Sequence, residues 1–253
     1  MLDRPEEYAR MAEVEEIHWW YKSLHQRVIH TLTKYGLGSE SPILDAACGT
    51  GGLMLKLREA GFQSLQGFDF SEVAVQFCRS RGMEIGKHSL LEVKEVYPQG
   101  HFAGICSLDT LCYLEPPDWI KVTTGLADLL APRGLLVFNL PSFSGFAGTH
   151  DLSVGIKRRF SKADLPRLYD PSRLELLEAH YWPFLLSPLI YLVRRLQRRA
   201  LSRNPRLPLK SDLHFPVNWI NRPLYLLTCL EYWLRLPCPW GSSLYLVFQE
   251  NCA

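Results

Sequence analysis

Two aspartates stand on either side of a glycine-rich bend in the first third of the chain. Ile43–Gly52, which reads ILDAACGTGG, places an apolar strand directly before the glycines and a helix directly after them. Glycines allow a tight turn and let a ligand lie against the backbone, above the amino terminus of the helix. Asp69 ends the next apolar segment, where a carboxylate can accept hydrogen bonds from the hydroxyls of a ribose. This spacing predicts a site for a nucleoside-containing ligand; an ordinary glycine turn and a helix-capping aspartate are the alternatives.

The residues around the bend indicate that the ligand carries positive charge. Met54 stands where a dinucleotide-binding G-x-G-x-x-G motif has its third glycine or alanine. No Lys-Ser or Lys-Thr pair follows the glycines, as a triphosphate-binding loop would require. The Asp45 carboxylate beside the bend would repel a pyrophosphate and attract an ammonium or sulfonium group. A nicotinamide oxidoreductase is therefore disfavoured.

Strand-like and helix-like segments alternate along the chain around this bend. Strands are predicted at 42–46, 64–70, 83–86, 102–108, 134–140, 174–182 and 242–249. Helices are predicted at 5–35, 52–60, 71–81, 116–132 and 161–170, and an irregular loop at 142–160. Repeated strand-then-helix units form a parallel sheet that is covered on both faces. We expect an α/β, Rossmann-like, doubly wound fold with a mostly parallel seven-stranded sheet and a helical, apolar insertion before the last strand.

The motifs resemble those of a known enzyme family. LDAACGTGG (44–52) followed by GFDFS (67–71) resembles the first two motifs of the class I S-adenosylmethionine-dependent methyltransferases, in particular their ubiquinone-type and bacterial small-molecule members. The resemblance continues through SLDTL (107–111) and LLAPRG (129–134). It implies one methyltransferase domain over 1–253, with S-adenosyl-L-methionine as its cofactor. Its expected parts are a helical lid at 1–38, a cofactor-binding core at 39–145, and a substrate-side region at 146–253 that includes the insertion 183–241.

The resemblance also implies roles for the residues around the bend. Asp45 and the glycines would hold the methionine part of the cofactor, Asp69 would hold its ribose, and Phe70 would pack on its adenine. The family often has an aspartate near the adenine after the third strand, and here that stretch reads KHSL (87–90). The cofactor-binding residues expected on this basis are Asp45, Ala47, Cys48, Gly49, Thr50, Gly51, Asp69, Phe70, His88, Ser89 and Leu90.

Methyl transfer from a sulfonium needs alignment, exclusion of water and, for some acceptors, removal of a proton. His150 and Asp151 form a polar pair beyond the fifth strand, where an acceptor would approach, and histidine titrates near neutral pH. We therefore take His150 as the candidate base; a solvated loop histidine is the alternative. Tyr113, where related enzymes often carry histidine, and Asp109 are further candidates at the same end of the sheet. The chemistry requires no metal, and we expect none.

The aromatic run His18-Trp19-Trp20-Tyr21 resembles the amino-terminal segment of the ubiquinone-type O-methyltransferases, where the first helices close over the cofactor. We expect a lid, with an aromatic helix packed on the sheet edge as the alternative. The expected substrate-side residues are His18, Trp19, Tyr21 and Asp151. The stretch KRRFS (157–161) also resembles bacterial methyltransferases of lipid and glycan pathways.

An apolar segment beside clustered arginines occupies the region 181–206. YWPFLLSPLIYLV (181–193) is almost wholly apolar and shorter than the roughly 20 residues that span a bilayer. Arginines follow it at 194, 195, 198, 199, 203 and 206. This pattern suits contact with an anionic membrane surface or an apolar substrate entrance. The alternative is a buried helical cover for the sheet.

Composition narrows the function classes. The formal net charge of +2 comes without a long basic face, so we expect no nucleic-acid partner. Seven cysteines with no CxxC pair argue against a disulfide framework and a structural zinc site. The acidic amino terminus does not read as a signal peptide, so we expect a cytoplasmic protein, with membrane association left open. The favoured function is methylation of an oxygen or carbon on a small hydrophobic or lipid-linked acceptor; a non-catalytic cofactor-binding module acting through a partner is the alternative.

Overall fold

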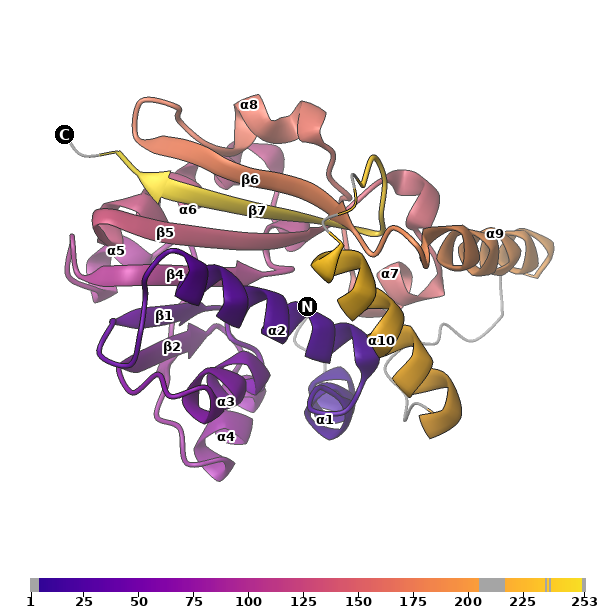
Figure 1. Cartoon of the computed structure of the whole chain (residues 1–253), viewed down its shortest axis with the longest axis horizontal. Coiled ribbons are helices and arrows are strands. Elements are labelled where there is room, and N and C mark those ends of the chain that lie inside the picture. The colour runs from indigo at the N-terminus through magenta and orange to yellow at the C-terminus, as the bar shows by residue number, and fades with distance from the viewer. Residues whose placement is uncertain (1–4, 205–216, 235, 237, 252–253) are drawn as a thin grey trace.

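Seven strands form one sheet in the computed structural model, which describes residues 5–204, 217–234, 236 and 238–251. The sheet order is β3-β2-β1-β4-β5-β7-β6. Strands β1 to β5 run parallel, and β7 lies antiparallel between β5 and β6 (Figure 1). The strands are β1 (Ile43–Ala46), β2 (Leu65–Asp69), β3 (Gly86–Lys87), β4 (Phe102–Leu108), β5 (Leu130–Pro141), β6 (Leu174–Trp182) and β7 (Ser243–Glu250). The predicted mostly parallel, Rossmann-like sheet is confirmed.

Helices cover both faces of the sheet because the central strands are apolar on both sides. Along β5, Leu135 and Val137 pack on one face, while Leu136, Phe138 and Leu140 pack on the other. The first face is covered by α2 and α3, and the second by α5, α6 and α8. The helices are α1 (Pro5–Val14), α2 (Trp19–Lys34), α3 (Gly52–Glu59), α4 (Glu72–Ser80), α5 (Val93–Val96), α6 (Pro116–Leu129), α7 (Thr149–Val154), α8 (Leu165–Leu168), α9 (Ser187–Arg203) and α10 (Asn218–Trp233).

Several sequence predictions differ from the observed elements. The strand predicted at 83–86 is observed at Gly86–Lys87, and the helix predicted at 161–170 is an α-helix only over Leu165–Leu168. The helix predicted to reach residue 132 ends at Leu129, because Leu130 already pairs with Phe102 of β4. Pro132 explains this early end, since proline removes a backbone donor and disfavours helical geometry in the residue before it. The loop predicted at 142–160 contains α7, which ends at Gly155 in a left-handed conformation (φ 78°) that glycine adopts readily.

The terminal helices lie together at the carboxyl ends of the parallel strands. Helix α10 packs against α2, and Asn221 joins them by accepting from Trp19 N–H (2.7 Å) and donating to the Ile17 carbonyl (2.8 Å). Glu231 accepts the backbone N–H groups of Phe184 and Leu185, and so fixes α10 to the connection before α9. The amino-terminal and carboxy-terminal segments therefore close the same edge of the sheet.

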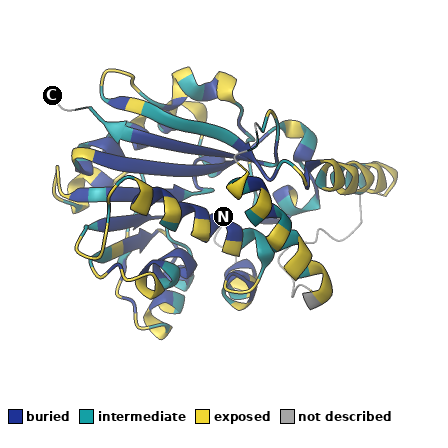
Figure 2. Ribbon diagram, viewed as in Figure 1, coloured by how far each residue is buried: buried dark blue, intermediate teal, exposed yellow. Residues whose placement is uncertain are grey.

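Helix α9 projects from this edge and is exposed along much of its length (Figure 2). Its exposed apolar side chains include Leu189, Leu192 and Leu196. Residues 205–216, which follow it, lie outside the described residues and include the last two positions of the predicted 181–206 segment. Among the described helices, none is both long enough and apolar enough to cross a bilayer.

Candidate functional site

A cavity of about 940 Å³ opens where the parallel strands end and the terminal helices meet. Ligands of open α/β sheets bind outside the carboxyl ends of the strands at this edge, where the strand order reverses between β1 and β4. Most of the predicted site residues line it, namely His18, Trp19, Tyr21, Asp45, Ala47, Cys48, Gly49, Asp69, Phe70, His88, Ser89, Leu90, Asp109, Tyr113 and His150. Thr50, Gly51 and Asp151 lie next to lining residues but are not part of the wall.

The glycine bend joins β1 to α3 through three residues with positive φ. These are Ala47 (62°), Gly49 (56°) and Gly51 (87°), of which Gly51 caps α3 in the left-handed region. A side chain at Gly49 would place its Cβ 2.6 Å from the Met11 methyl group. The bend is therefore held tightly under α1, and its backbone is open to a ligand only from the cavity side.

Asp45 presents a buried carboxylate oxygen at the end of β1. Its Oδ2 atom has no hydrogen-bond partner within the described structure, and the residue is 3% exposed. Burial, with smaller contributions from Asp69 and Glu15, raises the pKa of Asp45 to about 8. A buried acceptor of this kind is stabilised by a cationic donor, since an unsatisfied buried polar group costs about 1–3 kcal/mol. The orphaned oxygen therefore fits an ammonium group beside the glycine bend.

Asp69 ends β2 and accepts three hydrogen bonds. Gly49 N–H donates to Oδ2 (2.9 Å), while Ser71 N–H (3.0 Å) and the Tyr8 hydroxyl (3.3 Å) donate to Oδ1. Burial raises the pKa of Asp69, and the two backbone donors oppose that shift. Tyr8 on α1 thus occupies an acceptor position that a ribose hydroxyl could take. The ribose role of Asp69 and the helix-capping role coexist in this geometry.

Residues that follow β2 and β3 form another part of the cavity wall. Phe70 follows Asp69 and is 45% exposed, so its ring is free to cover a flat ligand. His88, Ser89 and Leu90 line the cavity after β3. His88 N–H donates to the Asp69 carbonyl (3.1 Å), which keeps the two strand ends together.

Sequence reasoning missed a cluster that ties α1 to the glycine bend. The Thr50 hydroxyl donates to Glu15 Oε1 at 2.6 Å, and Arg81 forms an ion pair with the same oxygen. Arg81 also donates to the carbonyls of Thr50 (2.8 Å) and Ala12 (2.7 Å). Burial raises the pKa of Glu15 despite these donors. The partners are 31 to 69 positions apart, so no local spacing pattern indicates them.

Asp109 directly follows β4, has φ 53° and lines the cavity. The Asn139 side-chain amide donates to both of its carboxylate oxygens, at 3.1 and 3.0 Å. Burial raises the pKa of Asp109 to about 7, and Asn139 and Arg159 limit the rise. Burial also holds the pKa of Tyr113 well above its usual value, so its hydroxyl keeps its proton near neutral pH.

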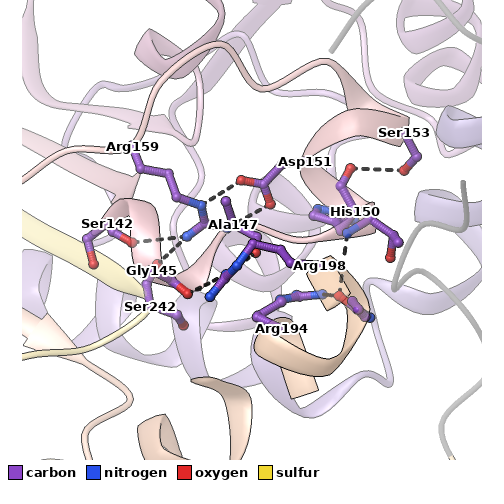
Figure 3. Close-up of polar contacts among 12 residues, drawn as sticks. Ser142, Gly145, Ala147, His150, Asp151, Ser153, Arg159, Arg194, Arg198 and Ser242 are labelled. Atoms are coloured by element: carbon purple, nitrogen blue, oxygen red, sulfur yellow. Dashed lines mark hydrogen bonds and ion pairs between the residues drawn. The ribbon is translucent and has the colours of Figure 1, made fainter. Parts of the chain in front are cut away.

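His150 and Asp151, which the sequence pairs, point to different surroundings on α7. His150 lines the cavity. Asp151 is buried in a bidentate ion pair with Arg159, at 2.6 and 2.8 Å (Figure 3). Arg159 also donates to the carbonyls of Ser142 and Ser242, which join β5 to β7. Asp151 therefore anchors α7 to the sheet.

The aromatic run at the start of α2 covers one side of the cavity. His18, Trp19, Trp20 and Tyr21 all line it. The Trp20 ring stacks on Trp182 of β6 with centroids 5.7 Å apart, so the run packs on the sheet and covers the site at the same time. Residues of the two stretches singled out in the sequence also line the cavity, namely Lys157, Arg159, Leu186, Leu189, Ile190, Val193 and Arg194. Lining residues that the sequence did not single out include Tyr8, Met11, Glu15, Ile220, Asn221 and Leu224.

Comparison with known proteins gives a match over the glycine bend and the strands that follow it. Residues 43–134 match a family model described as a methyltransferase domain. YqeM of Bacillus subtilis (strain 168), which is named as a candidate methyltransferase, is 31% identical over 112 residues, or 42% of this chain and 44% of YqeM. The chain thus spans less than half the length of this curated relative.

Solved structures share the fold at low sequence identity. A chain of the complex between the Haloferax volcanii Trm112 methyltransferase activator and a candidate methyltransferase superposes with a TM-score of 0.61, at 16% identity over 98% of this chain and 96% of the other. An S-adenosylmethionine-dependent methyltransferase from Archaeoglobus fulgidus gives 0.56, at 14% identity over 90% and 94%. Geranyl diphosphate C-methyltransferase from Streptomyces coelicolor gives 0.54, at 15% identity over 90% and 79%. The predicted class I methyltransferase fold is confirmed.

Proposed function

Because residues 43–134 match a family model described as a methyltransferase domain, we propose that this chain transfers a methyl group from S-adenosylmethionine to a small, hydrophobic or lipid-linked acceptor. The methylated atom is an oxygen or a carbon. The observation that supports this most directly is the Asp45 carboxylate oxygen without a hydrogen-bond partner in the described structure. It is buried beside a glycine bend, in a cavity whose lining is largely apolar.

The residues around the glycine bend and at the ends of β2 and β3 fit the cofactor. Asp45 would take its ammonium group, the Gly49–Gly51 backbone would lie along its methionine part, and Asp69 would take the ribose in place of Tyr8. Phe70 would cover the adenine, with His88 to Leu90 at its edge. When bound, the cofactor supplies a methyl group that is already activated on a sulfonium.

The chain itself contributes alignment, exclusion of water and a proton acceptor. The aromatic residues at the start of α2 and the residues of α10 that line the cavity would exclude water from bound ligands and hold donor and acceptor in line. Asp109, with a pKa near 7, accepts the proton of an acceptor that has one to lose. His150, which also lines the cavity, is the second candidate for this step, and the Tyr113 hydroxyl orients the acceptor.

A membrane surface is the proposed source of the acceptor. Trp219 and Trp233 on α10 are 76% and 77% exposed, and Leu189 and Leu192 on α9 are more than half exposed. Arginines lie on the same helix α9 at 194, 195, 198, 199 and 203. Aromatic and apolar side chains beside basic ones bind the interface of anionic bilayers, with each basic residue contributing about 1 kcal/mol. These helices border the cavity, so an acceptor could enter from the lipid.

Calorimetry with S-adenosylhomocysteine and with NADH tests the cofactor assignment. We expect S-adenosylhomocysteine to bind and NADH not to bind, and Asp45→Asn to weaken binding at least tenfold. Asp118→Asn, in the first turn of α6, is the matched control. Binding of NADH alone would contradict the proposal. Binding of the cofactor without methyl transfer to any long-chain alcohol, phenol or carboxylate would favour the non-catalytic alternative.

Co-sedimentation with vesicles tests the membrane contact. We expect binding to vesicles that contain anionic lipid, loss of binding in Leu192→Asp, and unchanged binding in Ile120→Asp, a similarly apolar and exposed position on α6. No binding of the unchanged chain at low salt would contradict this part of the proposal.

A further inference from the structure

His25, a buried histidine of α2, lines the cavity one turn after Tyr21. The residue is 5% exposed, and its Nδ1 atom has no hydrogen-bond partner in the part of the chain that the structure describes. A buried polar atom that stays unpaired costs free energy. Such an atom in a residue that lines a cavity therefore indicates a bound ligand, and the position of His25 decides which part of the ligand it meets.

The imidazole of His25 lies where α2 packs against α3. Leu24, its neighbour in the sequence, belongs to the same buried cluster as Leu53 and Leu57 of α3. Burial, with a smaller contribution from Lys56 of α3, lowers the pKa of His25 to about 3. The imidazole is therefore uncharged near neutral pH, with one ring nitrogen as a donor and the other as an acceptor. The positive potential of Lys56 favours an anionic partner for the donor.

The amino terminus of α3 adds backbone donors at this place. Its N-cap residue, Gly51, provides no side-chain hydrogen bond to the first turn. The first N–H groups of a helix have no acceptor within the helix, and together with the helix dipole they attract anions. Gly52 and Leu53 of this turn line the cavity. Glu15 approaches Gly52 from α1, but its ion pair with Arg81 balances its charge. This corner of the cavity therefore suits a carboxylate.

From this arrangement, and resting on the proposed function, we propose that His25 binds the carboxylate at the amino-acid end of the cofactor. The imidazole N–H donates to one carboxylate oxygen, and the first turn of α3 donates to the other. The ammonium group is attached to the same carbon atom as the carboxylate and lies at Asp45. His25 and Asp45 thus recognise the two opposite charges of the amino-acid end from two elements, α2 and β1. Helix α2 thereby takes part in cofactor recognition through a polar contact.

Titration of the full chain with two ligands tests this proposal. The first ligand is S-adenosylhomocysteine, and the second is its analogue in which hydrogen replaces the carboxylate while the ammonium group remains. We expect the unchanged chain to bind S-adenosylhomocysteine at least tenfold more tightly than the analogue, because hydrogen bonds to a charged group are the stronger ones. Equal affinity for the two ligands would overturn this proposal and leave the proposed function standing. Failure of both ligands to bind would contradict the proposed function as well.

Variants of α2 assign the carboxylate contact to His25. His25→Phe should weaken binding of S-adenosylhomocysteine at least fivefold and change the affinity for the analogue by less than about twofold, which also reports that the site is folded. His25→Gln, which keeps an N–H donor, should restore part of the loss. His30→Phe, at an exposed position of the same helix outside the cavity wall, should change neither affinity. Unchanged affinity for S-adenosylhomocysteine in His25→Phe, or an equal loss for both ligands, would overturn the proposal.

Discussion

The side-chain amide of Asn139 donates to both carboxylate oxygens of Asp109, while its own oxygen accepts the indole N–H of Trp182 at 2.8 Å. Trp182 in turn stacks on Trp20, which lines the cavity. A chain of contacts therefore runs from α2 through Trp182 of β6 and Asn139 of β5 to Asp109 in the cavity wall. It fixes the Asp109 carboxyl in a buried place where its pKa rises to about 7.

The first prediction concerns the stability of the ligand-free chain between pH 4 and pH 7. The pKa of Asp109 is higher in the folded protein than the ordinary aspartate value of 3.8, so the folded state binds more protons in this window. The free energy of unfolding should therefore fall as pH rises. At about 1.4 kcal/mol per pKa unit, the contribution of Asp109 is at most roughly 4 kcal/mol.

Urea unfolding at several pH values measures this effect. Asp109→Asn should lose less stability than the unchanged chain between pH 4 and pH 7, and Asp118→Asn should behave as the unchanged chain does. Asp45 contributes a fall of the same sign, up to about pH 8, in both proteins. Identical pH slopes for Asp109→Asn and the unchanged chain would show that Asp109 ionises normally.

The second prediction links Asp45 to the pH dependence of cofactor binding. With a pKa of about 8, Asp45 is protonated in much of the free protein at pH 6 to 7. It must lose that proton to pair with an ammonium group, so affinity should rise with pH up to about pH 8, by at most tenfold per pH unit. Calorimetry in buffers of different ionisation heats should detect the released proton. In Asp45→Asn the affinity should be lower and nearly independent of pH; a persisting proton release would assign it to another group.

The third prediction concerns the attachment of α1 to the glycine bend. Arg81→Met leaves Glu15 buried without its ion-pair partner, and removal of one partner from a buried pair typically costs about 3–5 kcal/mol. We expect faster hydrogen exchange across α1 and weaker binding of S-adenosylhomocysteine. Arg79→Met, two positions earlier in the last turn of α4, removes an exposed arginine that is 3.9 Å from Glu72 and should change neither quantity. Unchanged exchange in Arg81→Met would mean that Met11 and Tyr8 suffice to hold the helix.

The core of the fold could be predicted because its signals are local. The strand–glycine–helix sequence of Ile43–Gly52 requires left-handed backbone at Gly49 and Gly51, and that is what the bend contains. Asp69 could be placed because a polar residue that ends a parallel strand lies at the same edge as the bend. The alternation of apolar strands with helices in the later part of the chain likewise predicts a parallel sheet, although it does not give the order of the strands.

The cover of the site could not be predicted because its contacts join distant segments. Glu15 meets Thr50 and Arg81 through packing of α1, and neither spacing nor composition encodes that approach. Asp151 shows the same limit, since its position next to His150 indicated a substrate contact while its carboxylate meets Arg159. The short helix α7 is predicted as a loop because the residue that stabilises it, Arg159, lies eight positions away from Asp151 in the sequence and is buried in the fold.

The last prediction follows from that buried pair. Asp151→Asn leaves the Arg159 guanidinium, 8% exposed, without its counter-charge, so the free energy of unfolding should fall by about 3–5 kcal/mol. Replacing both residues, as in Asp151→Leu with Arg159→Met, should recover part of this loss, because no buried charge then remains. Lys157→Met should cost less than about 1 kcal/mol, since its pair with Glu115 is exposed. Cofactor affinity should stay unchanged where the variants remain folded. If Asp151→Asn is as stable as the unchanged chain, the pair does not anchor α7, and the role of Asp151 would have to lie with a ligand.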